Sequence, residues 1–299
     1  MTTLVRSSGG SGPGMARELG FEVVAHRGFS SRQPEMTVAA YREAVEWSVV
    51  EGVPLGLECD VRFSADGELV CVHDAVLGRT GGVGGRVGEW SVAELRGMDF
   101  GSWRVVGASV EQRSLVTLAD LLGLVGAARA GGAEVGVVVE TKHPCERGLG
   151  LERRVVEMVE GCGWGGVGSP VRVITFSVAG AVLVASLLPG VGVSLLLEGG
   201  LGSCVGGVLP PGVRVAGVEV GLLRRDPGFV ERAARYGNEV HAWTVNDPVE
   251  MEWCRSLGVA AITTDYPDRA AAILRGTPLA REGPRQSSVT PRRCGEELR

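Results

Sequence analysis

The chain has 299 residues, of which 44% are hydrophobic and 5% aromatic, and its formal net charge is −5. This length allows a large buried core in one or two domains, and the negative charge argues against a nucleic-acid partner, which needs a basic surface. We expect no transmembrane helix, which would need about 20 consecutive apolar residues. The seven cysteines are scattered and odd in number, which fits neither a disulfide framework nor a zinc site and favours a reduced, cytoplasmic setting.

Both ends of the chain differ in composition from its middle. Residues 1–19 are rich in Ser and Gly, and residues 276–299 in Pro, Arg, Ser and Glu, so we expect disorder at both ends. The segment between them, residues 20–275, is expected to form one domain. It opens with an apolar strand at 21–25, and Thr37 can cap a helix that ends before Gly52.

The next two predicted strands carry charged residues in apolar surroundings. In residues 57–63, Glu58 and Asp60 alternate with apolar residues and therefore share one face, about 7 Å apart. The turn Ala65-Asp66-Gly67 favours a hairpin, so that residues 69–73 fold back antiparallel and end at His73. Adjacent buried carboxylates are unfavourable unless a positive group lies between them. The pair therefore indicates a divalent cation.

A Gly-rich segment, residues 75–110, interrupts the alternation of strands and helices. Its glycines lack the strand-to-helix context of a phosphate-binding loop, so we interpret the segment as a flap over the site. Within it, Ser91 and Glu94 form a capping box that opens a short helix. Beyond it, strands are predicted at 135–142, 171–176, 193–197, 215–220, 240–245 and 260–264. Helices are predicted at 118–130, 151–160, 177–189, 227–236, 248–257 and from Asp268.

Leaving out the folded-back strand, eight parallel strands remain, with helices between them, although residues 199–213 are too rich in Gly and Pro to predict a helix there. This pattern predicts an α/β fold, the TIM (β/α)8 barrel, with a small insertion after the hairpin of the second strand. A doubly wound open sheet is the alternative, but it has no natural place for eight strands that each follow a helix.

In such a barrel the active site lies at the carboxyl ends of the strands. Polar residues gather there: His26, Arg27, Glu58, Asp60, Glu140, Lys142, Thr175, Ser177, Glu219, Trp243, Asn246 and Asp265. The acidic ones on the second and third parallel strands offer only oxygen ligands, which suits Mg²⁺ or Ca²⁺. His26 and His73 suit proton transfer near neutral pH, and Arg27 and Lys142 suit an anionic phosphoryl oxygen. Together they indicate metal-assisted phosphoryl chemistry.

Seven short motifs occur in one order along residues 22–275. They are His26-Arg27-Gly28, Pro34-Glu35-Met36-Thr37, Glu58-x-Asp60, His73-Asp74, Glu140-x-Lys142, Trp243-Thr244-Val245-Asn246 and Thr264-Asp265-x-Pro267. This series resembles that of the glycerophosphodiester phosphodiesterases. The resemblance implies that Glu58, Asp60 and Glu140 bind one divalent cation, Mg²⁺ or Ca²⁺.

The same resemblance implies the remaining roles. His26 and His73 would be the general acid and base, and Arg27 and Lys142 the phosphate ligands. Trp243 would lie near the glycerol moiety, with Glu35, Asn246 and Asp265 in support. The 2-hydroxyl of a glycerophosphodiester, such as glycerophosphocholine or glycerophosphoethanolamine, would attack phosphorus and expel the alcohol, and the cyclic phosphate would be hydrolysed to glycerol 3-phosphate.

One position departs from the family pattern, because Met36 stands where the family usually has Asn. We expect altered positioning near the site rather than lost catalysis. Two other functions stay open: a lysophospholipase D-like phosphodiesterase of the same superfamily, and a barrel that binds a phosphodiester with little or no turnover. The partner is expected to be a small molecule, and the sequence leaves the oligomeric state open.

Several of these residues could instead have structural roles. Glu58 and Asp60 could form ion pairs with Arg62 or Lys142, and Trp243 could be a packing residue. We place His143 in a loop and expect His241 to pack or to face solvent, so both are left out of the chemistry. Cys59 is expected to face the helices.

Overall fold

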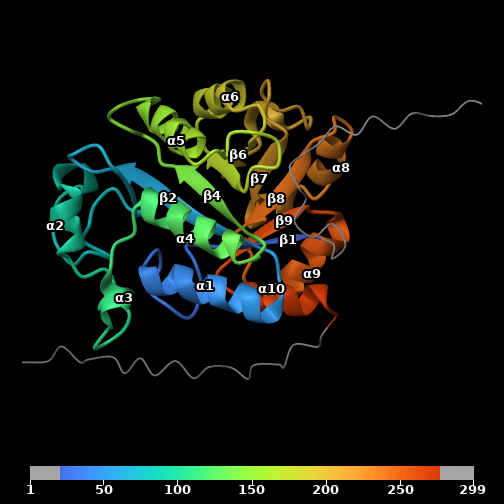
Figure 1. Ribbon diagram of the computed structural model, residues 1–299. Helices are drawn as coiled ribbons and strands as arrows, with labels where there is room; N and C mark the ends of the chain where they lie inside the picture. Colours follow the sequence, from blue (N-terminus) through green and yellow to red (C-terminus); the bar gives the residue numbers. More distant parts are fainter. Residues whose placement is uncertain (1–20, 277–299) are drawn as a thin grey trace, which may run out of the picture.

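The computed structural model describes residues 21–276, which form a barrel of parallel strands surrounded by helices (Figure 1). The expected disorder at residues 1–19 and 276–299 concerns a part of the chain that, except for Gly276, lies outside the described residues. In this range no helix is both long and apolar enough to span a bilayer.

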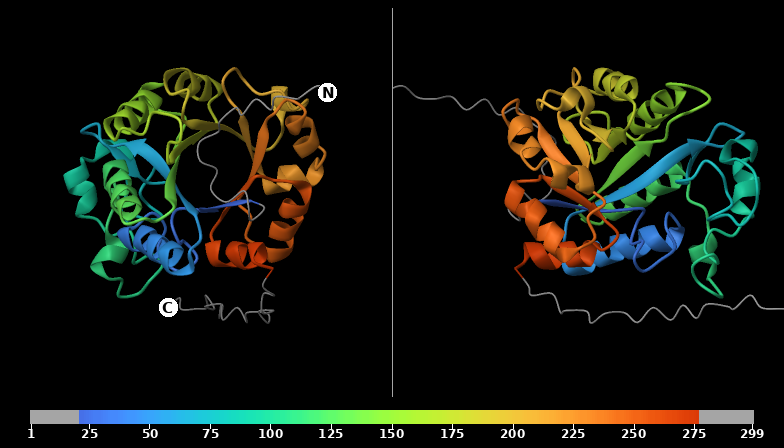
Figure 2. Two further views of the ribbon diagram at one scale, coloured as in Figure 1. Left: turned by 45° about the vertical axis from the view of Figure 1, so that its right-hand side comes forward. Right: turned by 180° about the vertical axis from the view of Figure 1, so that it is seen from behind.

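The barrel consists of eight parallel strands, as predicted, and its closure excludes the open sheet. In the described range β1 pairs with both β9 and β2, and the sheet order is β1-β9-β8-β7-β6-β5-β4-β2, with β3 added antiparallel to β2. Figure 2 shows the strands arranged around one axis. The parallel strands are β1 Glu22–Ala25, β2 Leu55–Phe63, β4 Val135–Thr141, β5 Val171–Thr175, β6 Gly192–Leu197, β7 Val215–Glu219, β8 Glu239–Trp243 and β9 Ala261–Thr264; β3 spans Leu69–Cys71.

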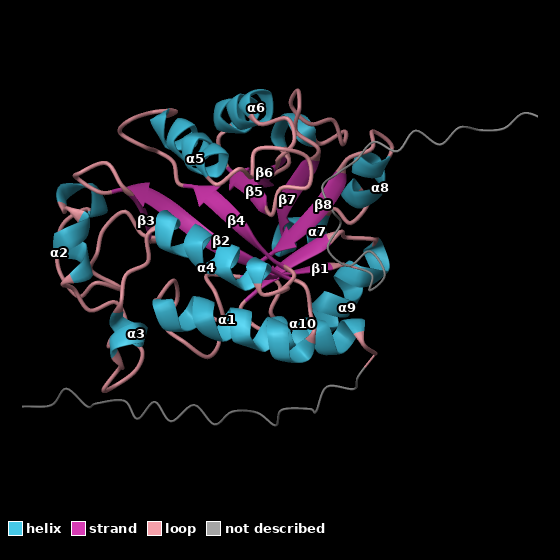
Figure 3. Cartoon of the chain, in the orientation of Figure 1, coloured by secondary structure: helices cyan, strands magenta, loops and turns pink. Residues whose placement is uncertain are grey.

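Helices cover the outside of the barrel (Figure 3). They are α1 Val38–Glu51, α4 Leu118–Ala130, α5 Gly150–Gly161, α6 Val178–Leu187, α7 Val220–Arg225, α8 Phe229–Ala234, α9 Pro248–Leu257 and α10 Pro267–Leu274. The predicted start of α1 is confirmed, because Thr37 Oγ1 accepts a hydrogen bond from the backbone N–H of Ala40. Gly52 follows α1 with φ 63°, a conformation that favours glycine.

Two details of the predicted elements are wrong. The strand assigned to 215–220 ends at Glu219, and the six-residue helix α7 follows it, which the sequence analysis missed. The helix assigned to 227–236 is α8 and covers only Phe229–Ala234. Helices of about one and a half turns are too short to show the apolar repeat on which such a prediction depends.

The predicted insertion forms a small lobe beside the carboxyl end of β2 (Figure 1). It contains the short elements η1 Val87–Glu89, α2 Val92–Arg96 and α3 Val110–Arg113. The predicted capping box of α2 is confirmed, with Ser91 and Glu94 as its two partners. The lobe has its own apolar cluster, made of Val70, Val72, Leu77, Val87, Leu95, Phe100 and Leu115. This cluster, which is separate from the main core, packs the lobe against β3.

The main core lies between the outer face of the barrel and the helices. On β2, Leu57, Cys59 and Val61 are buried in it, as expected for Cys59 from its alternation with the acidic residues. Glu58 and Asp60 therefore point to the barrel interior, at the strand end where a TIM barrel carries its active site.

Candidate active site

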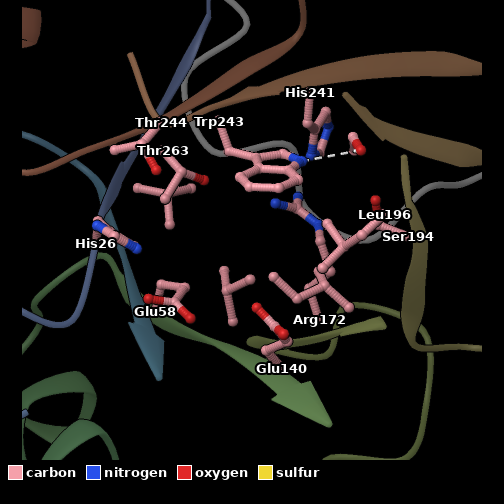
Figure 4. A pocket seen from close by; sticks show the side chains of 14 residues that line it. His26, Glu58, Glu140, Arg172, Ser194, Leu196, His241, Trp243, Thr244 and Thr263 are labelled. Carbon is pink, nitrogen blue, oxygen red and sulfur yellow. Dashed lines mark hydrogen bonds between the residues drawn. The ribbon is translucent and has the colours of Figure 1, made fainter. Parts of the chain in front are cut away.

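Three buried carboxylates meet inside the barrel mouth. Asp60 on β2 and Glu140 on β4 are register partners, and Glu58 precedes Asp60 by one alternation of the strand. Each of the three offers a ligand oxygen, and these oxygens lie within 4.8 Å of one another. Figure 4 shows Glu58 and Glu140 at the edge of the pocket, with His26 beside them.

Burial and mutual repulsion disturb the titration of this trio. Burial and the charge of Asp60 raise the pKa of Glu140 to about 7 and hold that of Glu58 well above its usual range. Burial acts to raise the pKa of Asp60 too, but Lys142 and Arg27 outweigh it, so the net shift is downward. Lys142 Nζ lies 2.7 Å from Asp60 Oδ1 and 2.6 Å from Glu140 Oε1. The protonated, neutral forms of Glu140 and Glu58 are therefore favoured, and an additional positive charge at the site would favour their ionised forms.

The trio fits a hard divalent cation. Asp60 Oδ2 is buried and accepts no hydrogen bond, since its contact with Arg27 Nε, at 3.3 Å, is an ion pair without hydrogen-bond geometry. Buried carboxylate oxygens without donors are unfavourable unless an ion coordinates them, and an all-oxygen set suits Mg²⁺ or Ca²⁺. The structural alternative holds in part, because Lys142 does pair with Asp60. Arg62 instead donates to the carbonyl of His73, at 2.9 and 2.7 Å.

Two histidines flank the carboxylates, and each has an acidic partner. His26 Nδ1 lies 2.7 Å from Asp265 Oδ1. Asp265 also accepts hydrogen bonds from Ser30 and Asn246, and although burial acts to raise its pKa, the contacts with His26, Asn246 and Ser30 lower it to about 2. The predicted supporting residues Asn246 and Asp265 thus belong to one hydrogen-bond group around His26.

His73 is held in the same way by an acidic neighbour. Its Nδ1 lies 2.7 Å from Oδ1 of the adjacent Asp74. Burial lowers the pKa of His73, partly offset by the charge of Asp60. When a carboxylate accepts a proton from Nδ1, the Nε2 atom is left as the basic nitrogen. Both histidines have such an arrangement.

Arg27 follows β1 in an unusual backbone conformation. Its φ is 58°, its N–H donates to Glu58 Oε2 at 2.9 Å, and its guanidinium donates to Glu35 Oε1 at 2.8 Å. Met36 also has a positive φ, 55°, and its N–H donates to the carbonyl of Arg27. Asn adopts this left-handed region more readily than Met, which gives a physical reason for the family's usual residue at position 36.

Trp243 combines packing with a place at the pocket. Its Nε1 donates to the carbonyl of Gly217 at 3.0 Å, and its ring meets Phe176 edge to face, with centroids 5.6 Å apart. Figure 4 shows the indole along the pocket wall, the position in which an aromatic ring can contact a substrate. Thr175 and Ser177, also at strand ends, bond the backbone instead: Thr175 Oγ1 donates to the carbonyl of Thr141 on β4, and Ser177 caps α6.

The pocket also contains polar residues outside the predicted site, of which Arg172 and Ser194 were not identified from the sequence. Arg172, Ser194 and His241 line it together with the residues above (Figure 4). Arg172 pairs with Glu22 at 2.8 Å, and His241 is buried, in agreement with the expectation that it packs. Strand alternation could have identified two of these residues. Arg172 lies two residues before the inward-facing Ile174 on β5, and His241 lies two residues before the inward-facing Trp243 on β8.

Known proteins share this sequence and this fold. Residues 26–269 match the model of the glycerophosphoryl diester phosphodiesterase family. The chain belongs to this family. It is 35% identical over 260 residues to a probable glycerophosphodiester phosphodiesterase 1 of Mycobacterium tuberculosis, covering 84% of this chain and 92% of the relative. The family model spans every residue assigned to the site, from His26 to Asp265, and the chain is an enzyme of the phosphodiesterase class.

Solved structures of this family superpose on the barrel. A glycerophosphodiester phosphodiesterase from Agrobacterium tumefaciens has a TM-score of 0.66 at 26% identity and covers 84% of this chain and 99% of its own. A phosphodiesterase from Oleispira antarctica, solved in complex with the product sn-glycerol-3-phosphate, has a TM-score of 0.69 at 25% identity. That match covers 85% of this chain and 96% of the Oleispira protein.

Proposed function

We propose that this protein hydrolyses glycerophosphodiesters, such as glycerophosphocholine or glycerophosphoethanolamine, to glycerol 3-phosphate and an alcohol. The observation that carries the proposal is the trio Glu58, Asp60 and Glu140 next to two carboxylate-paired histidines. The product bound in the Oleispira antarctica relative supports the choice of product.

The trio would hold one divalent cation, Mg²⁺ or Ca²⁺. When bound, the ion supplies Lewis-acid stabilisation of negative charge on the phosphoryl oxygens. Arg27 and Lys142 would bind the same anionic group from the protein side, because both cations lie against Asp60 at the barrel mouth. Trp243 would place its ring against the glycerol carbons.

His26 and His73 would exchange the protons. One imidazole takes the proton of the glycerol 2-hydroxyl as this oxygen bonds to phosphorus, and the other protonates the alcohol oxygen as its bond to phosphorus breaks. In the second step water attacks the cyclic phosphate, the 2-oxygen leaves, and the two imidazoles exchange roles. Asp265 and Asp74 keep each ring in the orientation that exposes Nε2.

Product analysis tests the proposal directly. The purified protein is incubated with glycerophosphocholine and Mg²⁺ or Ca²⁺, with and without chelator. Release of glycerol 3-phosphate that the chelator abolishes is the expected result. Release of choline only from lysophospholipid would instead make the protein a lysophospholipase D-like enzyme, and no product from either substrate would leave a phosphodiester-binding barrel.

Two further expectations accompany this function. The folded unit is proposed to be one domain, residues 20–275, in which residues 75–110 contribute to the site. A cytoplasmic location stays a prediction, and cell fractionation checks it. The described cysteines form no disulfide with one another.

A further inference from the structure

Arg79, in the insertion, contacts residues on both sides of the site. Its guanidinium donates twice to Glu35, from Nη1 to Oε2 at 3.0 Å and from Nη2 to Oε1 at 2.7 Å. Its Nε donates to Asp74 Oδ2 at 2.5 Å. Three donors of one planar group are thus engaged by two carboxylates, an arrangement that only arginine among the side chains can make.

Each of the two carboxylates has a second partner at the site. Glu35 Oε1 also accepts a hydrogen bond from Arg27, and Asp74 Oδ1 lies 2.7 Å from Nδ1 of His73. The result is a continuous chain of alternating charge, Arg27–Glu35–Arg79–Asp74–His73. The chain joins the loop after β1 to the loop after β3.

We propose that Arg79 is a positioning residue that holds the phosphate-binding Arg27 and the imidazole of His73 in one fixed arrangement. The inference rests on the roles proposed above for these two residues. Without Arg79, Asp74 loses the contact on Oδ2 that orients its carboxylate toward the ring. Glu35 would then keep only Arg27 among these partners, so Arg27 and His73 would no longer be linked through Glu35 and Asp74.

The lobe does not depend on Arg79 for its fold. The apolar cluster around Leu77 and Leu95 packs without it. Arg104 donates to the carbonyls of Ser30, Ser31 and Gln33 and so ties the lobe to the loop after β1. Since the Arg79 side chain is 41% exposed, its removal creates no cavity. Because Glu35 and Asp74 each keep a second partner, only a small loss of stability is expected beside the change in activity.

Kinetics of four variants test the inference on glycerophosphocholine with Mg²⁺. Arg79→Gln should lower kcat by about 10–100-fold, the range typical for the loss of a residue that orients a ligand or base. Arg79→Lys keeps the positive charge but lacks the three donors of the planar guanidinium group, so its kcat should lie between those of the wild type and Arg79→Gln. Millimolar guanidinium should restore part of kcat to Arg79→Ala. The control is Arg96→Gln in the same lobe, where an exposed pair with Asp120 at 2.9 Å is lost and wild-type kcat is expected.

The outcomes separate this inference from the proposed function. A wild-type kcat in Arg79→Gln, or a loss of kcat that tracks a lower unfolding temperature and resists guanidinium, overturns the role of Arg79 while leaving the function in place. An inactive wild-type protein overturns the function. If the wild-type protein is inactive, the NMR resonances of the His73 ring still test the inference. The chain has only four histidines, so the signals that disappear in His73→Gln are those of His73. They should shift in Arg79→Gln and not in Arg96→Gln; unshifted resonances in both overturn the inference.

Discussion

Asp60 and Glu140 are register partners on neighbouring parallel strands, and one ammonium group lies 2.7 Å from the first carboxylate and 2.6 Å from the second. This group, Lys142 Nζ, neutralises one charge of a site that contains three carboxylates. The remaining imbalance shows in the raised pKa of Glu140, about 7, and of Glu58. A site with this imbalance is set up to bind an additional cation.

The stability of the protein with and without a divalent ion tests this proposed cation binding in the absence of substrate. Because the ion would bind only the folded trio, Mg²⁺ or Ca²⁺ at 100 times its Kd should stabilise the protein by about 2.7 kcal/mol. Glu140→Gln should lose most of this gain, since it removes a ligand. Glu146→Gln changes a carboxylate whose side chain is 83% exposed in the loop after β4 and should keep the gain. Thermal unfolding with and without the ion measures the effect, and equal gains in all three proteins would contradict the metal site.

Replacement of the histidines tests the proton-transfer roles. His26→Ala and His73→Ala should each lower kcat by about 10²–10⁴-fold. Each ring is partly exposed and contacts one carboxylate, so both variants should remain folded, with a measurable unfolding temperature. Steady-state kinetics and a thermal melt on the same samples give both quantities. Near-normal kcat in either variant would remove that residue from the mechanism.

Asp265 should contribute to the fall in the free energy of unfolding at acid pH. Its pKa in the folded protein is about 2, against 3.8 for the free side chain, because His26, Asn246 and Ser30 outweigh the effect of burial. A lowered pKa means that its stabilising effect is complete above about pH 4 and is lost as the pH falls toward 2. The shift corresponds to about 2 kcal/mol.

Urea unfolding of wild type and Asp265→Asn at several pH values measures this effect. The difference in the free energy of unfolding should be constant from pH 7 to about pH 5 and shrink on further acidification. A difference that stays the same down to about pH 2.5 would show that the carboxylate charge is not what stabilises the fold there.

Regular alternation made most of the site predictable. On β2, Glu58 and Asp60 interrupt an apolar strand at the inward positions, so their common face and their link with Glu140 follow from strand geometry alone. Arg79 lies in a Gly-rich turn with no repeat, and its partners Glu35 and Asp74 belong to other loops. Loop conformations of this kind depend on tertiary contacts, which local sequence patterns do not encode.

The charged interior below the site escaped prediction for a different reason. Glu22 and Arg172 stand on β1 and β5, 150 residues apart, and the sequence gives no sign that they pair. Burial acts to raise the pKa of Glu22, but the charge and hydrogen bonds of Arg172 outweigh it and lower the pKa. Arg172→Met would leave this carboxylate buried without its main partner, so a loss of about 3–5 kcal/mol is expected.

A double-mutant cycle in urea isolates that pair. Adding Glu22→Gln to Arg172→Met should recover much of the lost stability, because no unpaired charge remains in the barrel. As a control, Arg235→Ala removes a surface pair with Glu231, whose side chains are 65% and 75% exposed, and should leave stability nearly unchanged. Additive losses in the cycle would show that the two buried side chains do not act as a pair.

Glu152 on α5 supports the strand end that carries Lys142. It is fully buried, its Oε1 accepts a hydrogen bond from Thr141 Oγ1 at 2.8 Å, and His143 Nε2 lies 2.6 Å from the same oxygen. Thr141 and His143 flank Lys142, so one carboxylate fixes both neighbours of the proposed phosphate ligand. Glu152→Leu would leave the polar groups of Thr141 and His143 without this partner, which should lower the free energy of unfolding by about 1–3 kcal/mol.

KM and the Kd of the product should also change when Glu152 is replaced. If Lys142 is displaced, binding of the phosphoryl group weakens, so KM for glycerophosphocholine and the Kd of glycerol 3-phosphate should both rise several-fold, while the histidines on the other strands keep their positions. Glu157→Leu, on the same helix with a side chain 64% exposed, is the matched control and should leave both constants unchanged. Calorimetry of product binding measures the Kd. A wild-type Kd in Glu152→Leu, together with the expected loss of stability, would confine Glu152 to a structural role, because the phosphate ligand would then hold its place without it.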